Sequence, residues 1–265
     1  LRLINNPIVK KRNLPKYVKK LLREEKWLSK KKFNNLYLVG GTWRSLFKLH
    51  LFQNNHPVHI IHQYSIDKST LSKFVEKVSS FNKSKLKTVE YISKSRTQFL
   101  PYSSIILDEI MSITNPKKII CSISGLREGS LSIDHFKNTK ESEIFTKSIE
   151  YIALKRGDLG STYQKYFKFI LPVFDGNEHY NKKLLHLACV LSHMDWGLGA
   201  FQKAELVFQE TLNTPLLRLT HKERIQLALS CYWRYCSIKY NPKFEYLTFL
   251  NNNEIFSSKQ VGAAL

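Results

Sequence analysis

The chain has 265 residues, of which 43% are hydrophobic and 24% charged, so its composition is neither that of a disordered chain nor that of a fibrous protein. At roughly 150 residues per domain, this length predicts two compact units. Lys and Arg number 42 against 21 Asp and Glu, and the net charge of +21 favours a polyanionic partner: nucleic acid, an anionic membrane surface or polyphosphate. The alternative is that much of this charge is only a solvated surface, because Lys is plentiful throughout.

Cysteine usage and hydropathy indicate the compartment. Cys121, Cys189, Cys231 and Cys236 form no CxxC pair and have no disulfide-like spacing, which is typical of a reduced protein. Polar residues interrupt every apolar stretch well short of the ~20 residues that a membrane span needs. The first residues lack the basic-then-apolar build of a signal peptide. We therefore expect a cytoplasmic protein without a membrane partner.

Basic and apolar residues alternate with helical spacing from Lys10 to Lys32. The apolar positions recur at about 3.6-residue intervals, which predicts one basic amphipathic helix. These positions are Leu14, Tyr17, Val18, Leu21, Leu22 and Leu28.

A glycine turn follows this segment. The residues from Leu36 to Val39 predict a short buried strand, and Gly40 and Gly41 predict a tight turn before a helix that starts at Thr42. Glycines allow close approach of the backbone to a ligand, and the unpaired N–H groups of a helix start favour an anion. The Thr42 hydroxyl and the Arg44 guanidinium suit phosphate oxygens. The alternative is a turn with a purely geometric role.

Strands and helices continue to alternate up to about His135, which predicts an α/β unit. The expected elements are a strand from Val58 to Ile61, a helix capped by Asp67 and running to Val78, a helix opened by Pro101 and ended by Asn115-Pro116, and a strand from Lys118 to Ile123.

A second glycine turn, Gly125 to Gly129, follows the strand that ends at Ile123. Its amides are expected in the crevice at the carboxyl end of the strand. The favoured alternative for this turn is a helix start with a surface pair formed by Arg127 and Glu128.

After Phe136 the strand-like runs disappear, and amphipathic helical segments predict an all-α second unit. Five residues there invite a metal hypothesis: His179, His186, His193, Asp195 and His221. His186 and His193 are two helical turns apart, too far to share one ion without other elements, so ordinary interior or surface histidines are the favoured interpretation and no metal site is assigned. No G-x-S-x-G, HExxH or Walker A motif occurs in the sequence, so no catalytic residue is identified.

Four segments, taken in order, resemble the exopolyphosphatase/guanosine pentaphosphate phosphatase family: NLYLVGGTWRSLFKLHL, HPVHIIHQYSI, KSRTQFLPYSSIILDEI and KKIICSISGLREGSL. The helical segments LLHLACVLSHMDW and LALSCYWRY resemble the C-terminal domain of alphaproteobacterial members. The resemblance implies an α/β plus all-α protein. Residues 1–136 would form the second lobe of a ribonuclease H-like, actin/Hsp70-type ATPase fold, and residues 137–265 an HD-related helical domain.

The resemblance also implies an activity: hydrolysis of a terminal phosphoanhydride of inorganic polyphosphate or of the guanine nucleotide pppGpp, with Mg²⁺ as cofactor. Six positions carry over as phosphate- or nucleotide-binding residues, namely Gly40, Gly41, Thr42, Arg44, Arg96 and Arg127. The family's catalytic glutamate and its other phosphate loops belong to a first lobe whose motifs do not occur in this sequence.

Further expectations follow from the same resemblance. Ser192 and His193 align with the His-acidic pair of longer relatives, so an HD-type metal site is not expected. The final residues SSKQVGAAL resemble the beginning of a longer helix, so the sequence is expected to be cut at both ends. Family members are often dimers, which implies a homodimer.

Three hypotheses for function remain at this point. The favoured one is a phosphoanhydride hydrolase whose chain is partial and inactive alone. The second is a non-enzymatic module that binds polyphosphate, RNA or a guanine nucleotide through the basic helix and the glycine turn. The third is a decayed fragment that folds poorly because its sheet lacks a partner lobe.

Overall fold

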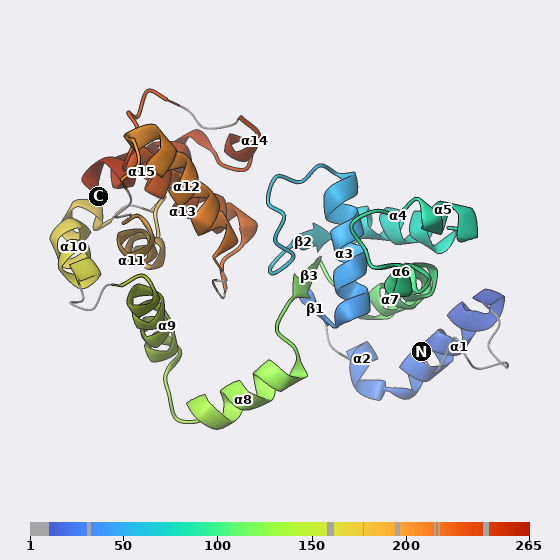
Figure 1. The fold of residues 1–265 in the computed structure, drawn as a ribbon. Helices are drawn as coiled ribbons and strands as arrows, with labels where there is room; N and C mark the ends of the chain where they lie inside the picture. Colours follow the sequence, from blue (N-terminus) through green and yellow to red (C-terminus); the bar gives the residue numbers. More distant parts are fainter. Residues whose placement is uncertain are drawn as a thin grey trace. The chain divides into compact units, whose positions relative to one another are not determined.

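The computed structural model describes residues 11–30, 33–157, 162–176, 178–193, 197–214, 216, 218–240 and 244–265. The chain divides into two compact units, Leu1–Leu131 and Ser132–Leu265. In Figure 1 the first unit runs from blue to green along the chain and the second from green to red.

A small mixed sheet lies in the first unit. Its strands are β1 (Asn35–Val39), β2 (Ser65–Asp67) and β3 (Lys118–Ser122), in the order β1-β3-β2. β1 is parallel to β3, with Val39 opposite Ser122, and β2 is antiparallel to β3. The predicted strands at Leu36 to Val39 and Lys118 to Ile123 are thus confirmed to within one residue at each end.

Two expectations about strands are wrong. No strand forms from Val58 to Ile61, because the later segment Ser65–Asp67 occupies the free side of β3, and Cys121 N donates to Tyr64 O at 3.0 Å to extend that pairing. β1 is not buried along its length either. Only Leu38 is buried, because side chains alternate between the two faces of a strand, and Asn35, Tyr37 and Val39 share a face that is exposed.

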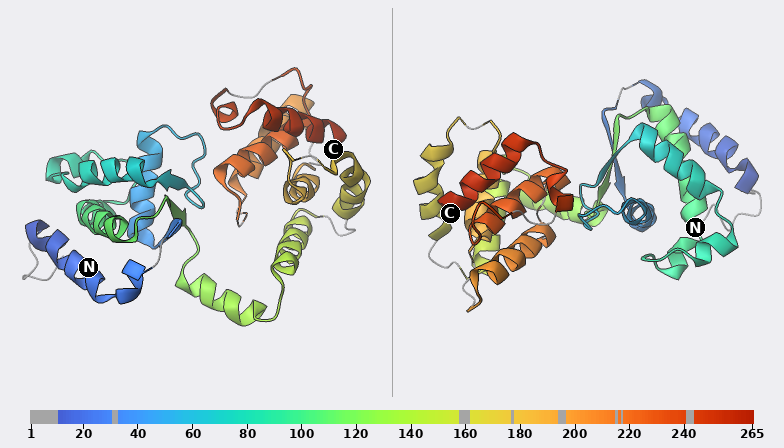
Figure 2. Two further views of the ribbon diagram at one scale, coloured as in Figure 1. Left: turned by 180° about the vertical axis from the view of Figure 1, so that it is seen from behind. Right: turned by 90° about the horizontal axis from the view of Figure 1, so that it is seen from above.

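The helices of the first unit are η1 (Lys11–Asn13), α1 (Leu14–Glu24), α2 (Lys26–Lys30), α3 (Gly41–Gln53), α4 (Lys68–Ser79), α5 (Lys83–Lys87), α6 (Lys94–Thr97), α7 (Leu100–Thr114) and α8 (Leu126–Phe136), which continues past the end of the unit. Of these, α3 and α4 pack against the sheet (Figures 1 and 2). Phe47 of α3, Leu71 of α4, Leu107 of α7 and Ile119 of β3 are fully buried in one core. At α7, the predicted proline start and the stop at Asn115, in the left-handed conformation at φ 44°, are confirmed.

The expected single basic helix is instead two helices, α1 and α2. Glu25 breaks them apart with a non-helical backbone (φ −85°, ψ 80°), and its carboxylate accepts a hydrogen bond from Trp27 Nε1 at 2.9 Å. Both helices pack against α7. Leu14 and Val18 are buried there, whereas Leu21 is 42% exposed. Lys10, Lys31 and Lys32, at the two ends of the expected helix, lie outside the described residues.

Within its described residues the second unit contains helices joined by turns and no strand. Its helices are α9 (Glu141–Lys155), α10 (Thr162–Ile170), η2 (Leu171–Phe174), α11 (Lys182–Leu191), α12 (Ala200–Asn213), α13 (His221–Trp233), α14 (Phe244–Leu247) and α15 (Asn252–Ala264). α13 is central, since it is buried along its length and packs against α11, α12 and α15. The observed architecture is therefore an α/β unit followed by a helical unit.

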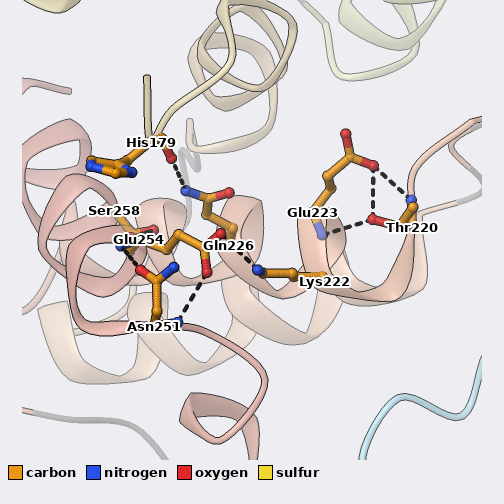
Figure 3. Close-up of polar contacts among 8 residues, drawn as sticks. All are labelled: His179, Thr220, Lys222, Glu223, Gln226, Asn251, Glu254 and Ser258. Atoms are coloured by element: carbon orange, nitrogen blue, oxygen red, sulfur yellow. Dashed lines mark hydrogen bonds and ion pairs between the residues drawn. The ribbon is translucent and has the colours of Figure 1, made fainter. Parts of the chain in front are cut away.

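Polar contacts form at the starts of α13 and α15 (Figure 3). Each helix begins with a reciprocal capping box, Thr220 with Glu223 and Asn251 with Glu254, which satisfies N–H groups that the first turn leaves unpaired. Lys222 then bridges the helices, with Nζ 2.7 Å from Glu254 Oε1. The capping boxes thus fix where both helices begin, and the Lys222–Glu254 pair adds one ion pair between them.

None of the described helices is long and apolar enough to span a membrane. The two longest, α7 and α9, have 15 residues each, against the ~20 that a span requires.

Candidate functional site

The carboxyl ends of two parallel strands bring the two glycine turns together. Val39 ends β1 opposite Ser122, which ends β3, so the turn at Gly40 and the turn at Gly125 leave the same edge of the sheet. A Cβ atom on Gly125 would lie 3.5 Å from Val39 Cγ1, which shows how close the two turns are. Helix α3 starts from the first turn and α8 from the second. We call this place, from Val39 to Arg44 and from Ser122 to Glu128, the glycine edge.

Gly40 gives the first turn its shape. Its φ of +126° and ψ of 158° form a conformation that residues with a Cβ atom rarely adopt. Arg44 N donates to Gly40 O at 3.0 Å, and the helix then continues from Gly41. Because glycine has no side chain to cap the helix, the first N–H groups of α3 receive no side-chain cap. The start of α3 therefore offers donors, and its helix dipole favours an anion.

Arg96 brings a positive charge to this helix start. Although Arg96 lies on α6, its guanidinium covers Gly41, since a Cβ atom there would be 3.1 Å from Cζ and 3.3 Å from Nη2 of Arg96. The absence of a side chain at Gly41 is thus what lets the guanidinium approach the backbone. Arg96 is exposed, so its planar set of donors remains accessible to an anion.

Arg44 is the second cation of the edge. It lies on the first turn of α3, is half-buried, and its Nε is buried without a hydrogen-bond partner among the described residues. The Arg44 charge helps to lower the pKa of Glu128. It also partly offsets the effect of burial on the Cys121 thiol, which raises the pKa of that thiol to about 12. Thr42, between Gly41 and Arg44, is half-buried on the same turn.

Glu128 already occupies the start of the neighbouring helix. Its Oε2 accepts a hydrogen bond from Gly125 N at 2.6 Å. Backbone hydrogen bonds and the nearby charges of Arg127 and Arg44 hold the pKa of this carboxyl below its usual value. Glu128 thus forms its hydrogen bond with the backbone at Gly125, and the expected surface pair with Arg127 is not among the ion pairs of the described residues. Of the two helix starts at the glycine edge, α8 is capped by the protein's own carboxylate and α3 is not.

All six predicted binding residues thus map to the glycine edge or against it: five belong to its two segments, and Arg96 reaches it from α6. Their ligand-binding role stays a prediction. The structural roles of two further residues of this region, Glu128 and His62, were not predicted from the sequence. Glu128 is recognisable by the spacing Gly-x-x-Glu, a variant of the capping box. His62, whose Nδ1 accepts from Ile123 N at 3.4 Å, carries no local signal.

The histidines of the helical unit do not form a metal cluster within the described residues. His186 stacks on Phe167, with ring centroids 4.3 Å apart, and burial lowers its pKa. His193 lies beside Arg234, with Nδ1 3.5 Å from Nη2. Asp195 lies outside the described residues. The four cysteines are free thiols.

The first unit is therefore an α/β unit in which an uncapped helix start and two arginines lie at the carboxyl ends of parallel strands, an arrangement that suits an anion. The model of the Ppx/GppA phosphatase family matches residues 5–136, which cover β1 to α8 and so the whole glycine edge. This region of the chain belongs to the Ppx/GppA phosphatase family. A search of curated proteins found no match to the chain.

Proposed function

We propose that the glycine edge binds the terminal phosphates of inorganic polyphosphate or of pppGpp, and that the chain is a partial phosphoanhydride hydrolase. The observation that carries the proposal is the uncapped start of α3 with the Arg96 guanidinium over Gly41. Amide donors there would hold phosphate oxygens, and Arg96 and Arg44 would neutralise the charge that develops as the phosphoanhydride breaks.

In this proposal hydrolysis needs a carboxylate from outside residues 1–265. A general base must lie within hydrogen-bond reach of the attacking water. Glu128 is the carboxylate of the glycine edge, and it is engaged with Gly125 N and flanked by two arginines. The residues described here would thus bind and orient the phosphate end. A first lobe of the actin/Hsp70 type would supply the base, and the helical unit would correspond to the HD-related domain.

The glycine edge does not fit a protein-bound Mg²⁺. Magnesium prefers several oxygen ligands, whereas this edge presents arginines and one engaged carboxylate, and the described residues contain no cluster of three or more acidic, His or Cys side chains. Mg²⁺ would have to arrive with the substrate phosphates.

Tripolyphosphate binding, measured by calorimetry, tests the site. We expect Arg96→Met to weaken binding about tenfold or more, because a hydrogen bond to a charged group is worth ~1.5–3 kcal/mol. The matched control is Lys94→Met, which removes one exposed charge from the same helix α6 without touching Gly41. Equal affinities of the two variants would refute the role of Arg96, and no binding by the wild type would refute the site.

Phosphate release from polyphosphate and from pppGpp with Mg²⁺ tests the catalytic part. We expect binding without release from residues 1–265 alone. Release by this chain alone would contradict the proposal that the carboxylate comes from elsewhere.

A further inference from the structure

Positive charge is concentrated in the first unit. Leu1–Leu131 contains 25 Lys and Arg against 8 Asp and Glu, a net charge of +17. Ser132–Leu265 contains 17 against 13, a net charge of +4. A uniformly lysine-rich composition would spread the charge evenly, so this asymmetry indicates a polyanion partner for the first unit.

Part of this charge forms one face of α1. At 100° per residue, Lys16, Lys19, Lys20 and Arg23 fall within an arc of about 100° that is opposite the buried positions Leu14 and Val18. All four side chains are exposed. They follow one another over roughly 10 Å of helix. We call these four residues the cation face.

The cation face has no acidic partner. None of its four side chains forms an ion pair or a hydrogen bond with the described part of the chain. Glu24 borders the arc, four residues after Lys20, but forms no ion pair within the described residues, and the Glu25 carboxylate accepts from Trp27 Nε1. Like charges this close repel one another, so the face gains free energy when an external anion neutralises it.

The residues around the cation face favour one class of polyanion over the others. A membrane-binding amphipathic helix inserts its apolar side into lipid, but the Leu14 and Val18 side of α1 is already packed in the protein, with α1 against α7. Single-stranded nucleic acid is bound by aromatic platforms among the cations, and no aromatic residue lies within the arc, since Tyr17 is on its flank. A bare linear polyphosphate needs only the row of cations.

We propose that the cation face of α1 is a docking surface for the internal phosphates of a long inorganic polyphosphate chain. This inference rests on the proposed function, in which the glycine edge of the same unit holds the terminal phosphates. The two sites together would favour long polyphosphate over short substrates such as pppGpp, because only a long chain reaches both.

The test compares long-chain polyphosphate with tripolyphosphate across salt concentrations. The variant K16Q/K19Q/K20Q/R23Q should bind long chains at least tenfold more weakly at low salt. The slope of log affinity against log salt should fall in magnitude by about 3, at roughly 0.7 for each phosphate contact of a single-stranded polyanion. Its affinity for tripolyphosphate should equal that of the wild type.

The control variant, K73Q/K77Q/K85Q/K87Q, removes the same charge from exposed positions of α4 and α5. Equal weakening by both variants would overturn the proposal, because overall charge would then explain the binding. Tighter binding of single-stranded RNA or anionic vesicles than of long polyphosphate, lost in the α1 variant, would overturn the identity of the ligand. If the wild type fails to bind tripolyphosphate, the glycine edge is refuted, while the comparison on long chains still decides the role of α1.

Discussion

Replacing Gly41 with alanine separates ligand binding from stability at the glycine edge. The new Cβ would lie 3.1 Å from Cζ, 3.3 Å from Nη2 and 3.4 Å from Nη1 of Arg96. Ordinary contacts begin at 3.4 Å, so the guanidinium must withdraw by a few tenths of an ångström. An exposed, flexible side chain makes this movement at little cost in folding free energy.

The two effects have opposite signs. Gly41 is the first residue of α3 and has no positive φ, so alanine there leaves stability unchanged or raises it by at most ~1 kcal/mol. Binding should weaken, because the methyl group covers the backbone where the anion approaches and displaces Arg96. Losing about half of a charge-assisted hydrogen bond, ~1.4 kcal/mol, corresponds to roughly tenfold weaker tripolyphosphate binding.

The measurement pairs calorimetric titration of tripolyphosphate with thermal unfolding. Gly129→Ala is the matched control, because Gly129 lies within α8 and a Cβ there has no heavy atom within 4 Å. We expect the control to bind like the wild type. Wild-type affinity in Gly41→Ala would show that Arg96 and the Gly41 backbone do not form the binding site.

Three predictions concern stability. Burial, followed by the charge of His56, lowers the pKa of His50 from 6.5 to about 4. The stability that the neutral His50 contributes is therefore complete above pH 6.5 and is lost as the pH falls towards 4. Urea unfolding should show a loss of at most ~2 kcal/mol between pH 7 and pH 5 that His50→Gln largely removes, and an unchanged pH profile in this variant would contradict the assignment. Arg224 is 1% exposed and donates to the carbonyl oxygens of Leu212, Thr214 and Leu216. Arg224→Met should therefore lower the free energy of unfolding by about 3–5 kcal/mol. A loss below ~1 kcal/mol would show that these three hydrogen bonds do not stabilise the fold. A Cβ on Gly262 would lie 2.6 Å from Trp233 Cβ and 2.8 Å from Ser230 O, so Gly262→Ala should destabilise the protein by about 1–3 kcal/mol. If the variant unfolds at the wild-type temperature, α13 and α15 can move apart to accommodate the methyl group without cost.

Local patterns predicted the elements that depend on local sequence. β1, α3, α7 and β3 each carry an apolar run or helical period with glycine or proline at a boundary, and each forms where expected. The strand from Val58 to Ile61 failed for a non-local reason. Its residues have the right composition, but which segment pairs with β3 is decided in three dimensions, and Ser65–Asp67 takes that place.

The candidate site likewise contains residues that a local pattern predicts and residues that only the tertiary packing brings there. Gly40, Gly41, Thr42 and Arg44 are contiguous, so a phosphate-binding turn could be predicted from their order alone. Arg96 is far from Gly41 in sequence, and only the packing of α6 against α3 places its guanidinium there, so no local pattern indicates it. The break at Glu25 was also missed, because the periodicity of the apolar residues continues across it.

The exposed edge of the sheet has a consequence for handling the protein. Within the described residues β1 pairs only with β3, so the outer N–H and C=O groups of β1 form a template on which another strand could add. The net charge of +17 on this unit keeps copies apart at low ionic strength. Concentrated salt shortens the Debye length to ~3 Å at 1 M and screens that repulsion. The protein should therefore stay monomeric longest in buffer of low ionic strength and self-associate as the salt concentration is raised.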